Sequence, residues 1–344
     1  MMKLIKNLII FSMILILAFS LTAGINQANR YTAQAANDSA IPGHVGGLLK
    51  KAMAGPDPNP IVGIGRGTDY AKVTMEAVTN AGGLNTLIKK GDVVLIKPNI
   101  CGYAAAGAPI ITDYRTVEAI VKKAAELGAS KIVIAEGTIS GNAFESSLVR
   151  LNKYDTIQGV QLINLNAFDK DDCYKLKPQK SLTGAEFYIP KIFMDADVVI
   201  NVAKLKTHFQ PEAVISLSLK NSFGVPPGKI YGTGYKNGLH MLGLKEAIID
   251  LNRIRKPDLS VIEGIVGGEG YGPLYNDPVK SEIIFAGKDL AALDTVALTF
   301  MGFNVEEVPH VALAGKEGLG ITDLSKIKIV GADLNAIKMK KFER

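Results

Sequence analysis

The sequence contains no tryptophan, two cysteines and four histidines among its 344 residues. With aromatic residues at only 7%, it offers few flat surfaces on which single-stranded nucleic acid stacks. Two cysteines are too few for a four-cysteine zinc or iron–sulfur site, so no iron–sulfur cluster is expected from this chain alone. Any other cofactor is unknown at this stage, as is whether Cys101 and Cys173 form a disulfide.

Several catalytic and nucleotide-binding motifs are also missing. No GxxxxGK[ST] loop occurs, and the glycine-rich segment VGGEGYGP does not follow a first strand as a GxGxxG fingerprint does. A GxSxG elbow is absent as well, so the sequence gives no support for serine-hydrolase chemistry. Ordinary nucleotide binding is therefore only weakly supported.

The N-terminus has the layout of a secretory signal. Lys3 and Lys6 precede an apolar run from Leu8 to Leu21, and Ala33 and Ala35 place small residues where a signal peptidase cleaves. We therefore predict a signal peptide over residues 1–35 and an exported, extracytoplasmic protein. The alternative is an uncleaved segment that anchors the chain in a membrane. Lipid attachment is excluded at LTAG because the next residue is not cysteine.

The positive charge of the chain comes partly from this segment. Its removal would take away three basic residues and no acid, lowering the formal net charge from +6 to +3. A charge of this size is too small to indicate nucleic-acid binding. The next segment, residues 36–60, is rich in glycine, proline and small residues and is interpreted as a linker. Residues 61–344 are expected to form one large α/β domain, with two subdomains as an open alternative.

The remaining sequence alternates apolar strand-like runs with amphipathic helical patterns. The clearest unit is 111–137, in which Asp113 or Thr112 caps a helix, Gly128 ends it and KIVIAEG follows as a buried strand. A second helix is predicted over 242–256, and 211–224 is interpreted as a helix with a strand as the alternative. This alternation predicts an α/β fold: a mainly parallel sheet with helices on both faces and Rossmann-like βαβ units.

In such sheets ligands bind at the carboxyl ends of the strands. Lys204, Lys206 and His208 follow a predicted strand at a spacing of two residues, which puts them on one face. Like charges in one row repel unless an anion or carboxylates lie opposite, so an anion site is one interpretation and a solvated loop the other. The other polar residues predicted near this edge are Lys97, Asn99, Glu136, Lys220, Asn221, Glu263 and Glu269.

We expect a cleft that binds a small anionic or carboxylate-bearing molecule. Lys204 and Lys206 would hold the anion, and Asn99 and Asn221 would orient it by hydrogen bonds. His208 or His240 is the expected proton carrier because an ordinary histidine titrates near neutral pH, with Glu263 or Glu269 as its partner. The other two histidines are set aside because of their positions in the linker and before a late helix.

Several segments resemble the domain-of-unknown-function 362 family in order along the chain: VLIKPN, AEG, NVAKLKTH, SLKNSFG, RKPDLSVIEGIVGGEGYGP and AGKDLAALDTVA. The resemblance spans about residues 61–331. It implies that the family's signature positions are Lys97, Asn99, Lys204, Lys206, His208, Lys220, Asn221, His240, Glu263, Glu269, Gly270 and Asp294. Asp294 is added to the expected ligand-binding residues on this basis.

Two departures from the family bear on function. Many relatives carry a ferredoxin-like segment that this chain lacks, and relatives often have aspartate where Glu263 stands. A fainter similarity links TDYR and the helix after it to nickel-pincer lactate racemases. An enzyme is the leading interpretation, with its reaction open. The alternatives are a non-catalytic envelope protein that binds a metabolite or metal, and a redox protein with a metal cofactor.

Overall fold

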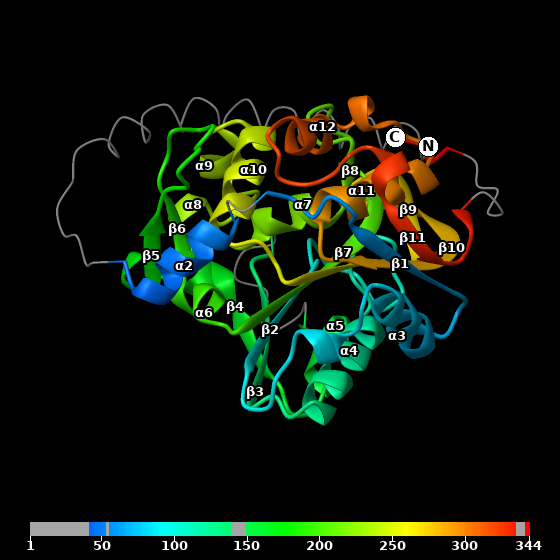
Figure 1. The fold of residues 1–344 in the computed structure, drawn as a ribbon, viewed down its shortest axis with the longest axis horizontal. Helices are drawn as coiled ribbons and strands as arrows, with labels where there is room; N and C mark the ends of the chain where they lie inside the picture. The colour runs from blue at the N-terminus through cyan, green and yellow to red at the C-terminus, as the bar shows by residue number, and fades with distance from the viewer. Residues whose placement is uncertain (1–40, 53–54, 139–148, 335–340) are drawn as a thin grey trace, which may run out of the picture.

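The computed structural model describes residues 41–52, 55–138, 149–334 and 341–344. The predicted signal peptide lies outside these residues. A nine-stranded sheet with the order β11-β1-β10-β9-β7-β2-β3-β4 runs through the molecule, and the short β8 pairs with β7 (Figure 1). Within this sheet only β10 and β8 run antiparallel to their neighbours. The prediction of a mainly parallel sheet is confirmed.

The elements have the following bounds. The strands are β1 Ile61–Arg66, β2 Val93–Pro98, β3 Lys131–Glu136, β4 Gln161–Asn164, β5 Cys173–Leu176, β6 Phe187–Pro190, β7 Val198–Thr207, β8 Ile215–Ser216, β9 Leu259–Tyr271, β10 Tyr275–Gly287 and β11 Lys328–Gly331. The α-helices are α2 Gly43–Ala52, α3 Tyr70–Asn80, α4 Tyr114–Glu126, α5 Val149–Leu151, α6 Lys191–Met194, α7 Ser218–Asn221, α8 Gly228–Tyr231, α9 Asn237–His240, α10 Leu244–Ile254, α11 Leu290–Phe300 and α12 Pro309–Lys316.

Helices cover both faces of the sheet, as predicted. In Figure 1, α3, α4 and α5 lie on one side, and α7, α10, α11 and α12 lie on the other. Each layer has its own apolar core: Val94, Ile96 and Ile120 belong to the first, and Leu95, Ile248 and Leu293 to the second. Alternating side chains of β2 thus enter opposite cores, which is why this strand is an unbroken apolar run.

The sequence unit around 111–137 forms as predicted. Asp113 accepts a hydrogen bond from the backbone N–H of Arg115 at the start of α4, and the helix ends before Gly128. Strands β2 and β3 on either side of α4 pair in parallel, which makes a βαβ unit. This unit brings the ends of two neighbouring strands, with Lys97 and Glu136, to the same edge of the sheet.

Two segments differ from the sequence interpretation. Residues 43–52, within the region interpreted as a linker, form helix α2, whose Val45 is fully buried and whose Leu48 and Leu49 pack on the core. The spacing of these three residues makes one apolar stripe, and packing of that stripe outweighs the glycines in the segment. Residues 211–224 form the short strand β8 and then the single turn α7, so neither predicted element is formed over its whole length.

Two further features concern membrane insertion and the cysteines. Within the described ranges, no helix is both long and apolar enough to cross a bilayer. Cys101 and Cys173 are both buried and are not joined by a disulfide in the described structure; Cys101 lies after β2, whereas Cys173 begins β5 in a separate two-stranded sheet.

Candidate functional site

A cavity of about 410 Å³ lies at the carboxyl ends of β2, β3 and β7. These strands are parallel neighbours, so their ends open at the same edge of the sheet. Helices α7 and α9 and the turn between β9 and β10 complete the wall. Its polar and aromatic lining is Asn99, Cys101, Glu136, Lys206, His208, Phe209, Gln210, Glu212, Ser216, Lys220, Asn221, Phe223, Tyr235, Lys236, Asn237 and His240.

Glu136 of the cavity wall forms a buried ion pair with Lys97, which was predicted as a ligand-binding residue but is not part of the lining. Burial lowers the pKa of Lys97 and raises that of Glu136, and the contact between the two groups opposes both shifts. Asn221 braces the pair: its side-chain oxygen accepts from Lys97 Nζ at 3.2 Å and from Asn99 Nδ2 at 3.1 Å. Its Nδ2 donates to Asn201 Oδ1 at 2.6 Å, so the orientation of the amide is fixed by both ends.

Two glycines allow the backbone to approach this pair closely. A Cβ at Gly224 would lie 2.8 Å from Lys97 Nζ and 3.0 Å from Glu136 Oε1. A Cβ at Gly137 would lie 2.3 Å from the carbonyl oxygen of Gly224 and 2.6 Å from Lys236 Nζ. Any side chain at these positions would displace charged groups of the wall, which gives AEG and NSFG a structural reason for ending in glycine.

Lys206 forms a second part of the wall and is itself buried. Its Nζ donates to the Ile110 carbonyl at 2.6 Å and to Cys101 Sγ at 2.9 Å, with the Pro273 carbonyl at 3.3 Å. Burial lowers the pKa of this lysine. Its neighbours supply dipoles and a thiol in place of a bonded carboxylate, so a protonated Lys206 contributes positive potential to the cavity.

Lys220 and Lys236 add two more amines to the lining. Burial, helped by the charge of Lys206, lowers the pKa of Lys220 to about 8. Burial lowers the pKa of Lys236 to about 7, although the charge of Glu136 opposes it. Lys236 Nζ donates to the Gly224 carbonyl at 2.7 Å. Lys220 Nζ, in contrast, has no hydrogen bond or ion pair with any residue that the structure describes.

Both predicted histidines line the cavity, but their protonation differs from the expectation. Burial and the charge of Lys220 lower the pKa of His240 to about 4, and burial with Lys220 and Lys206 lowers the pKa of His208 well below its usual value. Both rings are therefore neutral at neutral pH. Because His208 Nδ1 accepts from the backbone N–H of Gln210 at 3.2 Å, its proton is assigned to Nε2.

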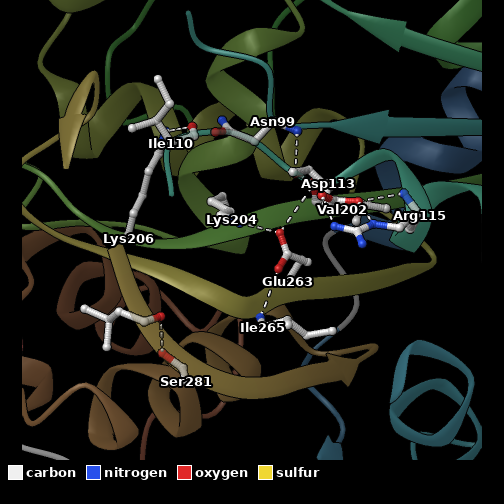
Figure 2. Close-up of polar contacts among 12 residues, drawn as sticks. Asn99, Ile110, Asp113, Arg115, Val202, Lys204, Lys206, Glu263, Ile265 and Ser281 are labelled. Atoms are coloured by element: carbon white, nitrogen blue, oxygen red, sulfur yellow. Dashed lines mark hydrogen bonds and ion pairs between the residues drawn. The ribbon is translucent and has the colours of Figure 1, made fainter. Parts of the chain in front are cut away.

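Lys204 shares a strand face with Lys206, as predicted, but its amine goes elsewhere. Figure 2 shows Lys204 turning to Glu263 on the neighbouring strand, whereas Lys206 extends to the Ile110 carbonyl. The Lys204–Glu263 contact is 2.5 Å with both side chains at 0% exposure, and the two residues are register partners between β7 and β9. Neither residue lies in the cavity lining.

Glu263 is held by further contacts to backbone N–H groups. Its carboxylate accepts the backbone N–H of Asp113 at 3.2 Å and that of Ile265 at 2.9 Å (Figure 2). Asp113 in turn binds Arg115 through Nε at 2.8 Å and Nη2 at 2.9 Å. The network ties β7 and β9 to the start of α4 and thereby fixes the strand that presents Lys206 and His208.

Two other predicted residues also lie outside the lining. Asp294 on α11 accepts from the backbone N–H groups of Ser218 and Leu219 at 2.8 and 3.0 Å, and burial raises its pKa to about 7. It holds the start of α7, the turn that carries Lys220 and Asn221. Glu269 accepts from the backbone N–H of Glu343 at 3.0 Å and so binds the C-terminal segment to β9. Direct ligand contact by either residue remains a prediction.

The cavity also gathers residues that the sequence reasoning did not select. Cys101 and Lys236 come from loops whose course was not predicted, and Ser216 follows from β8, which was expected as helix. The Ser216 hydroxyl and the Asn99 side-chain oxygen have no hydrogen-bond partner among the described residues. His310, set aside earlier, is fully buried on α12, where burial and the charge of Lys220 lower its pKa to about 3.

The described residues contain no group of three or more histidine, cysteine, aspartate or glutamate side chains placed to hold a metal ion. The two imidazoles of the lining stand beside amines, which repel a cation. The chemistry of the described wall therefore suits an anion better than a metal.

Comparison with known proteins identifies relatives. A family model described as "Domain of unknown function (DUF362)" matches residues 94–299. The thylakoid-associated protein sll1697 of Synechocystis sp. is 31% identical over 251 residues, which cover 70% of this chain and 73% of that protein.

Solved structures show more distant similarity. The lactate racemase apoprotein from Thermoanaerobacterium thermosaccharolyticum matches with a TM-score of 0.41 and 13% identity, over 60% of this chain and 51% of the racemase. A Thermotoga maritima protein matches with a TM-score of 0.38 and 12% identity, over 73% of this chain and 60% of its own. This chain thus spans about half the length of the racemase.

Proposed function

The chain belongs to the DUF362 family of unknown function, and we propose from the cavity itself that it binds a small anionic molecule. The observation that carries the proposal is the charge of the lining. Lys206, Lys220 and Lys236 face a cavity whose buried carboxylate, Glu136, is already bonded to Lys97. The other lining carboxylate, Glu212, is exposed.

The electrostatics of the cavity should couple anion binding to proton uptake. Burial is the main cause that lowers the pKa values of all three amines, and the charge of Lys206 adds to it at Lys220. An anion in the cavity would favour the protonated amines and raise these pKa values. Binding is therefore coupled to proton uptake, most strongly between the bound and free pKa values of Lys220 and Lys236.

Neutral groups in the same wall would orient the ligand. The His208 Nε2–H and the Ser216 hydroxyl are donors without a partner among the described residues, and the Asn99 side-chain oxygen is a free acceptor. A ligand that carries a carboxylate and a hydroxyl or carbonyl group would satisfy all three. Acid–base chemistry belongs to the proposal through His240, whose neutral ring lines the cavity near Lys220.

The test is anion binding by isothermal titration in two buffers with different ionisation enthalpies near pH 8. Acetate, oxalate, lactate and inorganic phosphate are the probes. We expect saturable binding with net proton uptake, and loss of both in a Lys220→Met/Lys236→Met double variant. Lys229→Met is the matched control, because Lys229 forms an exposed pair with Asp169 at 2.6 Å. Absence of binding by every probe, or unchanged binding by the double variant, contradicts the proposal.

Export is a separate part of the proposed function and rests on the sequence of residues 1–35. A named relative is thylakoid-associated. N-terminal sequencing of protein recovered from the producing organism tests this part. A mature start near residue 36 supports export, whereas intact residues 1–35 on protein recovered from the cytosol contradict it.

A further inference from the structure

The lysines around the cavity differ in one respect. Lys97 is bonded to Glu136, Lys204 to Glu263, Lys206 to the Ile110 carbonyl and Lys236 to the Gly224 carbonyl. Lys220 also lines the cavity, yet its amine has no hydrogen bond or ion pair among the described residues. An amine that is left free inside a cavity can react as a nucleophile if it loses its proton and an electrophile is bound beside it.

We propose that Lys220 forms a Schiff base with the carbonyl carbon of a small oxo acid whose carboxylate is bound in the same cavity. The inference rests on the proposed anion site and names its ligand class. The amine of Lys220, two further lysines and two neutral imidazoles line the same cavity. The electrophile must carry an anionic group, because the lining holds Lys206 and Lys236 next to this amine.

The surroundings favour the unprotonated amine. The charged and titratable groups that act on Lys220, or on which it acts, are Lys97, Cys101, Lys206, His208, His240 and His310. Burial, with the charges of Lys206 and Lys97, lowers the pKa of Lys220 to about 8, and Cys101 opposes the shift. Near pH 7.5 its neutral fraction is then on the order of a hundredfold larger than that of an ordinary lysine.

The condensation balances without an oxidant or reductant. The amine lone pair of Lys220 attacks the carbonyl carbon, and the carbonyl π electrons move to oxygen, giving a carbinolamine after a proton passes from nitrogen to oxygen. The second proton of the nitrogen then passes to the hydroxyl, which leaves as water while the nitrogen lone pair forms the carbon–nitrogen double bond. His240 is placed to carry the proton between the two atoms, since its neutral ring lines the same cavity.

Turn α7 holds the amine in position. Asp294 accepts the backbone N–H groups of Ser218 and Leu219 at its start, and Asn252 Nδ2 donates to the Leu219 carbonyl at 3.0 Å. The residue after the amine, Asn221, is tied to Lys97 and Asn201. A nucleophile fixed by its neighbours on both sides loses little freedom on reaction.

The experiment treats the protein with pyruvate or glyoxylate and cyanoborohydride, which reduces a Schiff base to a stable amine, and maps the adduct by peptide mass spectrometry. We expect one adduct, on Lys220, at least about tenfold above any surface lysine, because its larger neutral fraction favours attack. Lys236 has a lowered pKa too, but its amine is held by the Gly224 carbonyl at 2.7 Å, so we expect less adduct there. Lys220→Arg keeps the charge and should remove the adduct, whereas Lys229→Arg, at an exposed pair, should retain it.

Lactate separates this inference from the anion site, since it carries a carboxylate and no carbonyl. If pyruvate and lactate both stabilise the protein but no adduct forms on Lys220, the Schiff base is wrong and the anion site stands. If the adduct is spread over surface lysines, or persists in folded Lys220→Arg, the Schiff base is likewise wrong. If neither acid binds and no adduct forms, the Schiff base is wrong, and the anion site is then decided by the titrations with acetate, oxalate and phosphate.

Discussion

Lysines of β7 and α7 differ in how the charge of the buried amine is neutralised. Lys204 is paired in register with Glu263, and both side chains have 0% exposure. Lys206, two residues on, and Lys220 face a cavity and have no bonded carboxylate among the described residues. The first arrangement, which we call the closed pair, has its charges balanced within the fold, whereas the second, the open region, would be balanced by the anion that we propose. The difference separates lysines that support the fold from lysines available to a ligand.

The largest loss of stability is expected when the closed pair of Lys204 and Glu263 is broken. Glu263→Gln leaves Lys204 charged and buried without its counter-ion, so the free energy of unfolding should fall by about 3–5 kcal/mol. Urea denaturation followed by circular dichroism measures this. The double variant Lys204→Met/Glu263→Gln should lose less than the single one, and an equal or larger loss would show that the pairing is not the cause.

The amines of the cavity should make the stability of the protein depend on pH. The folded pKa values of Lys220 and Lys236, about 8 and about 7, lie below those of unfolded lysine, so the unfolded chain binds more protons between these values. Stability should therefore rise, by on the order of 3 kcal/mol, from about pH 7 to about pH 9. Denaturation across this range checks it.

The rise should be smaller in Lys220→Met/Lys236→Met and unchanged in Lys229→Met. A bound anion should also flatten it, because the anion favours the protonated amines. A rise of the same size in the double variant would place its origin outside the cavity.

The role of Asp294 in holding the start of α7 can be tested by mutation. Asp294→Ala removes the acceptor for two backbone N–H groups and the Ser218 hydroxyl at the start of α7. We expect a loss of about 2 kcal/mol in unfolding free energy together with weaker anion binding, since α7 carries Lys220. Titration calorimetry at a temperature where the variant is folded measures the second effect. Unaltered binding would remove Asp294 from the support of the cavity.

The smallest effect on stability is expected for Lys220→Met, and it tests directly whether the two groups of lysines differ. Lys220→Met should raise the unfolding free energy at neutral pH by about 1 kcal/mol, because it removes the cost of burying a protonated amine whose pKa is lowered to about 8 and breaks no bond to a described residue. Lys204→Met, at the closed pair, should instead destabilise the protein. Anion binding should show the opposite ranking, with Lys220→Met the more impaired. Equal stability losses in the two variants would contradict the division into closed and open regions.

Much of the fold could be predicted because its signals are local. The apolar runs of β2, β3 and β7, and the cap and glycine stop of α4, are written in short stretches of sequence. Helix α2 was not predicted, and a strand at β8 was considered only as the alternative to a helix. Their formation depends on packing against distant elements, as Val45 does in the core and Ser216 does beside Lys206.

The candidate site was predictable in part for the same reason. Strand ends and spacing selected Lys206, His208, Lys220, Asn221 and His240, all of which line the cavity. Spacing alone could not show that the amine of Lys204 turns to Glu263. It also could not show that both histidines are neutral, because their lowered pKa values come from burial and from Lys220, which lies on a different element.

Residue order along single strands and helices is enough to specify the α/β alternation and the concentration of lysines, histidines and amides at the carboxyl ends of the strands. Which lysines meet a carboxylate and which face the cavity depends on contacts between distant parts of the chain. Each pairing joins residues that are 39 or more positions apart, such as Lys97 with Glu136 and Lys204 with Glu263. Such contacts depend on strand order and register, which short-range patterns do not specify.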